Sequence, residues 1–161
     1  MPELPEVETI KRGLNRLIVG CQVLDIKTDS PQQIKPSLNE VKRALLENKI
    51  EKIERRGKLL QIFFSKGAVL GIHLKLTGRL LIRKKSDPYD KWQHITISLS
   101  GDKELRFADS RKFGWFKLFK DKKELEKVLS EFGKEPLDDL KLKDFKEILA
   151  SSRRPVKVVL M

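Results

Sequence analysis

The sequence contains only one cysteine, Cys21, and no uninterrupted apolar run of about 18 residues, the length that suggests a membrane-spanning helix. A single cysteine cannot form a disulfide within the chain, and it cannot build a four-cysteine zinc site. The first residues are acidic, whereas a secretory signal peptide begins with basic residues followed by an apolar stretch. We therefore expect no membrane partner, and a reducing cytoplasm is the location that fits best.

Acidic residues are too few to balance the basic ones. Lysine and arginine number 35 against 23 aspartate and glutamate residues, which gives a formal net charge of +12. A charge of this size is typical of nucleic-acid-binding proteins, although an anionic membrane surface or solubility alone would also account for it. The length of 161 residues and the apolar content of 39% suit one globular domain with a core of its own.

The start of the chain, MPELPEVETI, places a proline directly after the initiator methionine. Removal of the methionine would leave Pro2 with a free secondary amine. An α-amino group titrates at a pKa of about 7.7 to 8.0, well below the value of about 10.4 for lysine, so a useful fraction is unprotonated near neutral pH. Pro2 is therefore a candidate nucleophile.

An amphipathic helix is predicted directly after this proline. A second proline suits the first helical turn, and apolar residues recur at steps of three and four positions over 4–20. The positive end of the helix dipole then lies near Pro2, together with the carboxylates of Glu3, Glu6 and Glu8. These glutamates either complement the dipole or form an acid/base group with the amine, in which a carboxylate donates or accepts a proton.

The middle of the chain is rich in alternating apolar and polar residues, which indicate strands. Strands are predicted over 22–28, 50–64, 69–83, 95–99, 105–107 and 114–119, with interruptions near 55–58 and 77–78 that divide the two long segments. The alternation in 69–83 places Leu76 among the core-facing leucines. Helices are predicted over 121–132 and 142–150, whereas 38–46 fits a short helix or an approach to a strand. The fold class is therefore α+β and mainly β: an antiparallel β-sandwich of about eight strands with an N-terminal helix and two C-terminal helices.

Three further stretches contain candidate binding residues. RRGK at 55–58 places three cations beside a glycine, which fits either a charged edge strand or a phosphate contact. HLKLTG at 73–78 contains His73, which taken alone is an ordinary strand histidine. DSRKFGW at 109–115 combines an arginine, a phenylalanine and a glycine in a loop between strands. Such a loop fits a wedge that enters a DNA duplex, a surface cation–π pair or a core phenylalanine.

These motifs, in this order, resemble those of the formamidopyrimidine-DNA glycosylase family of bacterial base-excision repair enzymes. PELPEVE at the start matches almost residue for residue, and HLKLTG and DSRKFG are similar to later family motifs. The resemblance implies that Pro2 attacks C1′ of a damaged nucleotide and forms a Schiff base, which collapses by β,δ-elimination. It also makes Glu3 the proton donor, Glu6 a supporting catalytic residue and Lys58 a contact to phosphate near the reaction.

The resemblance further implies how the chain holds damaged double-stranded DNA. His73 would bind a phosphate near the lesion, and Leu76, where the family often has methionine, would fill the space left by the extruded base. Arg111 would pair with the cytosine opposite the lesion, Phe113 would intercalate and Lys112 would add a phosphate contact. Leucine is apolar and close to methionine in volume, so the filling role is retained on physical grounds.

The activity implied is that of a bifunctional DNA glycosylase and apurinic/apyrimidinic lyase that excises oxidised purines, such as 8-oxoguanine and formamidopyrimidines, from duplex DNA. An endonuclease VIII-like enzyme for oxidised pyrimidines is the alternative within this class, although the Leu4-Pro5 pair argues against it. Outside the DNA glycosylases, the alternative is a DNA-binding module with no catalytic activity.

The resemblance covers only the first domain of the family. We expect residues 1–155 to be the N-terminal catalytic domain and residues 156–161 to begin a linker to a second domain, which in the family contains a helix-two-turns-helix motif and a zinc finger. No cofactor is expected in residues 1–161, and one structural zinc is expected in that second domain. The protein is expected to be a monomer in the bacterial cytoplasm, associated with the nucleoid.

Overall fold

The computed structural model describes residues 2–135 and 140–159, and the chain divides into two compact units on either side of the Ser130–Glu131 bond. The first unit contains both sheets and helices α1 to α3, and the second contains α4 (Leu142–Ala150) and α5 (Val156–Val159). Met1 and the last two residues of the predicted linker lie outside the described residues. The predicted domain boundary after residue 155 stays a prediction.

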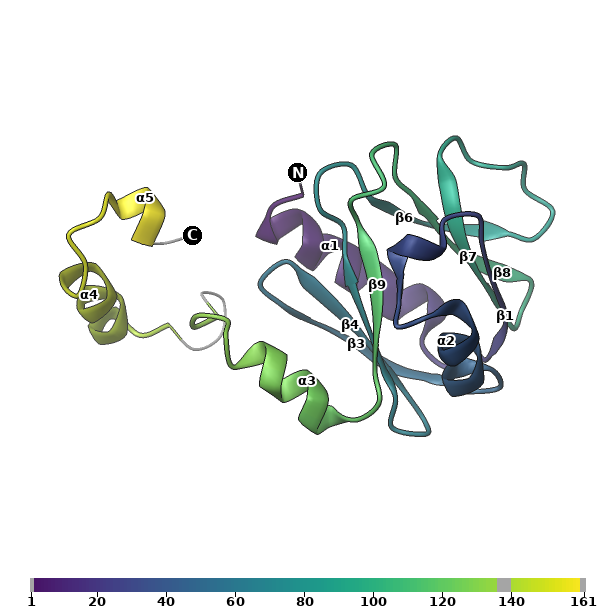
Figure 1. Ribbon diagram of the computed structural model, residues 1–161, viewed down its shortest axis with the longest axis horizontal. Coiled ribbons are helices and arrows are strands. Elements are labelled where there is room, and N and C mark those ends of the chain that lie inside the picture. The colour runs from purple at the N-terminus through teal and green to yellow at the C-terminus, as the bar shows by residue number, and fades with distance from the viewer. Residues whose placement is uncertain (1, 136–139, 160–161) are drawn as a thin grey trace. The chain divides into compact units, whose positions relative to one another are not determined.

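The first unit is built from two sheets (Figure 1). The four-stranded sheet has the order β1-β7-β8-β6, and its strands are β1 (Val23–Thr28), β6 (Arg79–Lys84), β7 (Gln93–Leu99) and β8 (Lys103–Ala108). The five-stranded sheet has the order β2-β9-β5-β4-β3, and its strands are β2 (Ile34–Lys35), β3 (Ile50–Arg56), β4 (Leu59–Phe64), β5 (Val69–His73) and β9 (Trp115–Phe119). The predicted sandwich is confirmed. It differs from the prediction in having nine strands among the described residues and one parallel pair, β2 with β9.

Three helices flank these sheets. Helix α1 (Leu4–Ile18) packs on β3 and β4, and it ends before Gly20, which adopts a φ of 85°. The ambiguous segment 38–46 is helical: α2 (Leu38–Leu45) begins after Ser37, whose side chain accepts a hydrogen bond from the third residue of the helix. Helix α3 (Lys122–Leu129) begins after Asp121, as predicted, because that carboxylate caps the first turn. A short 3₁₀ turn, η1 (Pro31–Gln33), follows β1.

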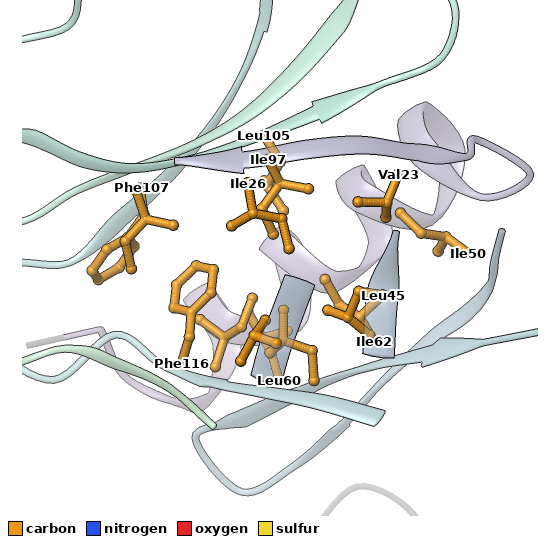
Figure 2. Packing of buried hydrophobic residues seen from close by; sticks show 14 of the residues in the cluster. Val23, Ile26, Leu45, Ile50, Leu60, Ile62, Ile97, Leu105, Phe107 and Phe116 are labelled. Carbon is orange, nitrogen blue, oxygen red and sulfur yellow. The ribbon is translucent and has the colours of Figure 1, made fainter. Parts of the chain in front are cut away.

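Side chains from the inner faces of the two sheets meet in one apolar core (Figure 2). Ile26, Ile97 and Phe107 of the four-stranded sheet face Leu60 and Phe116 of the five-stranded sheet, and all five are buried. The rings of Phe107 and Phe116 are tilted by 59° with centroids 5.1 Å apart, an arrangement that aromatic quadrupoles favour. Burial of one such side chain stabilises a fold by about 1.5 to 3 kcal/mol. The many buried side chains of this core together hold the two sheets in place, and the sheets in turn support the loops that connect their strands.

Two motif glycines lie directly against Phe107. A Cβ added at Gly78 would lie 2.4 Å from the Leu74 carbonyl oxygen and 2.9 Å from the Phe107 ring, and one added at Gly114 would lie 2.5 Å from the same ring. Any larger residue would force the backbone away from the core. Glycine at these two positions therefore allows the loops at 74–78 and 109–114 to approach one aromatic ring, which brings the two loops together.

The segment 69–83 is not one strand, because β5 and β6 belong to different sheets. Residues 74–78 cross from one sheet to the other, and Lys75 adopts a left-handed φ of 53°. This conformation ends the alternation of the strand, so Leu74 is buried whereas Leu76 is 39% exposed. The prediction that Leu76 faces the core with the other leucines was therefore wrong.

Candidate active site

The start of α1 holds the segment that contains Pro2. Glu3 is extended, and the Glu6 carboxylate accepts a hydrogen bond of 2.7 Å from the Glu3 backbone N–H. This bond satisfies a backbone donor at the helix start, where no carbonyl of the preceding turn is available. Glu6 therefore fixes the backbone next to Pro2, and Val7, which is 1% exposed, anchors the first turn in the core.

An ion cluster around the buried Glu8–Arg55 pair attaches α1 to β3. The Glu8 carboxylate accepts a hydrogen bond of 2.9 Å from Arg55 of β3, and it also pairs with Lys11 and Arg12 on its own helix. These three cations, Lys11 foremost, outweigh the effect of burial and lower the pKa of Glu8 from 4.5 to about 2. The Arg55 side chain is only 3% exposed, so this arginine of the RRGK motif is structural and not a solvated edge residue.

Lys58 lies at the turn between β3 and β4, directly after Gly57, which adopts a φ of 54°. Its ammonium is 2.9 Å from the Glu3 carboxylate, and the two side chains are 30% and 61% exposed, respectively. An ion pair with this exposure adds little to stability. Its consequence is positional, because it places a cation and a carboxylate beside Pro2.

His73 ends β5 and is paired in the sheet with Leu59, the residue after Lys58. Its Nδ1 atom accepts a hydrogen bond of 3.0 Å from the Lys75 backbone N–H, so the proton of the neutral ring lies on Nε2. Burial, followed by the charges of Lys75 and Lys58, lowers the pKa of His73 to about 4. The ring is therefore neutral near pH 7 and presents one N–H donor, which suits a phosphate oxygen.

An open hollow of about 400 Å³ lies at the Pro2 end of the first unit. It is lined by Pro2, Leu76, Thr77, Gly78, Arg79, Trp92 and Ser110. The hollow thus brings the predicted nucleophile and the predicted gap-filling leucine to one wall, although they lie 74 positions apart in the chain. A volume of this order is within the range of small-ligand sites.

The buried carboxylate of Asp109 connects the two motif loops. It accepts hydrogen bonds from the backbone N–H groups of Gly114 (2.8 Å) and Arg111 (3.2 Å), from the Gln33 amide (3.3 Å) and from the Thr77 hydroxyl. A carboxylate with several donors is well compensated for burial, and losing one donor would leave it poorly solvated. Asp109 therefore fixes the loop of Thr77 relative to the loop that contains Arg111.

The three predicted wedge residues lie at the exposed end of that second loop. Arg111 and Lys112 are exposed, Lys112 has a φ of 57°, and Phe113 is 58% exposed. Phe113 is thus not a core residue. Of the three roles that the sequence allowed for it, the DNA wedge and the surface cation–π pair remain. Among the described contacts the phenylalanine stacks with no cation, since the three cation–π contacts involve other rings.

Sequence analysis did not identify Trp92, Glu8 or Asp109 as site residues. Trp92 lies in a loop of mixed composition with no periodic signal, and Glu8 was named with Glu3 and Glu6 near the helix start but was given no role of its own. The preference of aspartate for a loop that holds several free backbone donors could have suggested Asp109. The Arg55 partner of Glu8 lies 47 positions away, and no local pattern predicts it.

Within residues 2–135 and 140–159, no three His, Cys, Asp or Glu side chains gather in a group that could hold a metal ion. No helix in these ranges is both long enough and apolar enough to cross a membrane. The zinc finger that the sequence resemblance implies would lie beyond residue 161 and stays a prediction.

The family model of the formamidopyrimidine-DNA glycosylase N-terminal domain matches residues 1–116. Formamidopyrimidine-DNA glycosylases from Streptococcus mutans and Pelotomaculum thermopropionicum are 37% identical over 163 aligned residues and 40% identical over 147 aligned residues, respectively. These alignments cover 100% and 90% of this chain, but 59% and 53% of the relatives. The chain therefore spans a little over half the length of the curated relatives that it matches.

Solved structures of similar proteins share the fold. Lactococcus lactis Fpg in complex with abasic-site-containing DNA has a TM-score of 0.91 and 33% identity, over 99% of this chain and 59% of that one. MutM in complex with carbocyclic 8-oxo-G-containing DNA has a TM-score of 0.90 and 34% identity, over 99% of this chain and 61% of that one. Fold, motifs and sequence agree, and the chain belongs to the formamidopyrimidine-DNA glycosylase family, of which it contains the N-terminal domain.

Proposed function

We propose that this chain is the catalytic part of a DNA glycosylase of base excision repair that also cleaves the strand at the resulting abasic site. The observation that carries the proposal is the position of Pro2 in the wall of the hollow, beside the Glu3–Lys58 pair. The substrate is duplex DNA that contains an oxidised purine, such as 8-oxoguanine or a formamidopyrimidine, with the damaged nucleotide extruded toward the hollow.

The reaction begins once Met1 has been removed and the Pro2 nitrogen is a free secondary amine. Its electron pair attacks C1′ of the deoxyribose, and the bond between C1′ and the base breaks with its electron pair on the base. Glu3 takes up the proton that the nitrogen loses. The nitrogen electron pair then forms the C1′=N bond while the C1′–O4′ bond breaks, the sugar ring opens and Glu3 returns the proton to O4′; the departed base takes a proton from water. The product of this step is an iminium ion between the Pro2 nitrogen and C1′.

The iminium ion makes the C2′ proton acidic, because the electron pair left on C2′ can move into the C=N⁺ bond. Loss of that proton breaks the C–O bond on the 3′ side, and a second elimination breaks the bond on the 5′ side. Lys58 lies 2.9 Å from the Glu3 carboxylate and holds it in place while it also offers a cation to a nearby phosphate. Glu6 acts through the Glu3 backbone that it fixes.

The DNA is held by the residues around the hollow. The Nε2–H group of His73 donates to a phosphate oxygen, and Lys112 adds a second phosphate contact. Leu76, exposed at the wall of the hollow, occupies the space that the extruded base leaves in the stack. Phe113 enters the duplex beside it, and Arg111 pairs with the base opposite the lesion. The shared Asp109 anchor lets the two loops act as one wedge.

Borohydride reduction tests the proposal directly, since it traps an iminium intermediate as a covalent protein–DNA adduct. The chain should form an adduct with a duplex that contains an abasic site. Glycine and serine inserted before Pro2 turn the amine into an amide and should abolish the adduct, whereas the same two residues at the C-terminus should not. Pro2→Gly should trap less, although its own α-amino group still reacts.

Two outcomes would contradict the proposed mechanism, and a third would contradict the proposed substrate. If the N-terminally extended protein formed as much adduct as the unextended one, a lysine side chain and not Pro2 would be the nucleophile. If the chain bound abasic-site DNA and formed no adduct, it would be a DNA-binding module without catalysis, the non-enzymatic alternative that the sequence also allowed. A preference for oxidised pyrimidines over 8-oxoguanine in the same trapping assay would favour the endonuclease VIII-like reading.

A further inference from the structure

The loop between β6 and β7, residues 85–92, is wrapped around one buried cation. Arg106 of β8 is only 3% exposed. Its guanidinium donates hydrogen bonds to five acceptors: the backbone carbonyls of Lys84 (3.3 Å), Asp87 (3.0 Å) and Pro88 (2.6 Å) and the carboxylates of Asp90 (3.1 Å) and Glu104 (2.8 Å). Four of these acceptors belong to the loop or to the residue before it, so Arg106 determines the path of the loop.

The end of this loop places a tryptophan in the hollow. Trp92 has a φ of 65°, a left-handed conformation that is uncommon for any residue other than glycine and unusual for a bulky one. Its carbonyl oxygen accepts a hydrogen bond of 2.9 Å from the backbone N–H of Asp109, and the next backbone N–H, of Gln93, donates to the Asp90 carbonyl. Strained backbone persists where neighbouring contacts hold it, and it is concentrated at functional sites.

The Trp92 side chain is 48% exposed although its backbone is fixed on both sides. The indole lines the same hollow as Pro2 and Leu76, and the Lys91 ammonium lies 5.3 Å from its ring centroid. A large exposed ring on a fixed backbone is a surface available to a ligand, because little backbone freedom remains to be lost on binding. The cation beside it suits a ligand with a phosphate.

We propose that Trp92 packs against the deoxyribose of the extruded nucleotide and that Arg106 is the residue that positions it. The inference rests on the proposed function, since it is the Pro2 amine that fixes where the sugar lies. The attacking nitrogen must come within about 3 to 3.5 Å of C1′, so the sugar occupies the hollow whose wall includes Trp92. The indole then shields the sugar and the iminium ion from water.

Arginine at position 106 is required by the geometry of its acceptors. A planar guanidinium has five N–H donors in a fixed arrangement, which matches three carbonyls and two carboxylates on different sides of the group. A lysine ammonium keeps the charge but has only three donors at one point. Arg106→Lys therefore removes hydrogen bonds to the loop, while the lysine still supplies a positive charge to the carboxylates of Asp90 and Glu104.

Fluorescence of Trp92 tests the contact. The chain has two tryptophans, so Trp115→Phe leaves Trp92 as the single emitter. Binding of a duplex with a tetrahydrofuran abasic analogue should shift the emission to shorter wavelength and reduce quenching by acrylamide, whereas an undamaged duplex of the same sequence should change both much less. Trp92→Ala should slow borohydride trapping on abasic DNA by about tenfold, the effect of one lost aromatic contact, and Trp92→Phe should restore most of the rate.

Arg106→Lys tests the positioning. It should slow trapping nearly as much as Trp92→Ala, and the double variant should be no slower than Trp92→Ala alone, because both changes remove one contact. The acrylamide protection of Trp92 by the abasic-analogue duplex should also be lost in Arg106→Lys. Arg83→Lys is the matched control: Arg83 also bonds to the Asp90 carboxylate but is partly exposed, and in the part of the chain that the structure describes its only carbonyl acceptor is Ile82 of β6, so trapping should stay close to the unsubstituted rate.

The outcomes separate the two proposals. An adduct that forms at the normal rate in Trp92→Ala, together with unchanged Trp92 emission at saturating DNA, would overturn the inference and leave the proposed function intact. Additive effects of Trp92→Ala and Arg106→Lys would overturn the positioning role. Absence of any adduct in the unsubstituted chain would overturn the proposed function and this inference with it. Circular dichroism shows whether each variant is folded, and if Arg106→Lys is unfolded the Trp92 variants still decide.

Discussion

Glu8→Gln should destabilise the protein because Glu8 is the ion that attaches α1 to the five-stranded sheet. The substitution keeps the shape of the side chain and removes its charge, so the buried Arg55 loses its Glu8 partner and Lys11 loses an ion pair. A carboxyl whose pKa falls from 4.5 to about 2 on folding stabilises the fold by roughly 3 kcal/mol, at about 1.4 kcal/mol per pKa unit. Part of this is screened, since Arg12 is 69% exposed, and about 2 kcal/mol is expected.

The pH dependence follows from the direction of that pKa. The folded value lies below the unfolded one, so the stabilisation is complete above pH 4.5 and is lost as the pH falls toward 2. Urea denaturation at a series of pH values measures it. The difference in unfolding free energy between the unsubstituted protein and Glu8→Gln should be about 2 kcal/mol at pH 7, corresponding to a melting temperature lower by about 4 to 8 °C, and should shrink to roughly half by pH 3.

Glu54→Gln is the matched control. Glu54 pairs with Lys52 at 2.6 Å on the same strand as Arg55, but both side chains are about half exposed, so the change should stay within about 0.5 kcal/mol. Equal losses for the two substitutions would show that a general loss of negative charge, and not the buried cluster, is being measured. A Glu8→Gln protein as stable as the unsubstituted one at pH 7, or a difference that persists unchanged at pH 3, would refute the reasoning.

Three further predictions concern the loops around the hollow. His73 should titrate by NMR with a midpoint near pH 4, below the value of 6.5 for an unperturbed histidine. The unfolded chain therefore binds the proton first, so the contribution of the neutral ring to the free energy of unfolding is complete above pH 6.5 and is lost as the pH falls toward 4. A midpoint above pH 6 would contradict the burial of the ring. Gly78→Ala should cost about 1 to 3 kcal/mol in urea denaturation because its Cβ would meet Leu74 and Phe107, whereas Gly13→Ala, with no atom within 4 Å, should be neutral or stabilising. Phe113→Ala should leave the affinity for undamaged duplex nearly unchanged and slow excision; unaltered excision across a series of lesions would remove Phe113 from the wedge.

Sequence patterns predicted correctly those elements whose structure depends on residues within the same segment. The recurrence of apolar residues in 4–20 predicted α1, and the alternation in 95–99 predicted β7. Asp121 predicted the start of α3 because a short carboxylate at a helix start is itself a local interaction. The motifs further allowed the residues with a family role, from Pro2 to Phe113, to be named before the fold was known, whereas Trp92 and Asp109 were not among them.

Periodicity misplaced the change of backbone direction in 69–83, which was predicted near 77–78 and begins at Lys75. The alternation in 69–83 continues through Leu76, yet Lys75 adopts a left-handed conformation and the chain passes to the other sheet. Nothing in the composition of this segment requires that crossing. It is favoured by the contact of Gly78 with Phe107, a residue of β8 that lies far along the chain.

By itself, the sequence determined the family, the helix that follows Pro2, the strand-rich middle of the chain and the residue types available for chemistry, because each of these depends on neighbours a few positions apart. Only the tertiary structure decided which of those residues meet. It paired Arg55 with Glu8, placed Trp92 in one hollow with Pro2 and Leu76, and joined Thr77 to Arg111 through Asp109. Those contacts form when the two sheets pack around a common core. A contact between segments far apart in the chain produces no periodic pattern in the sequence of either segment, so the sequence alone does not predict it.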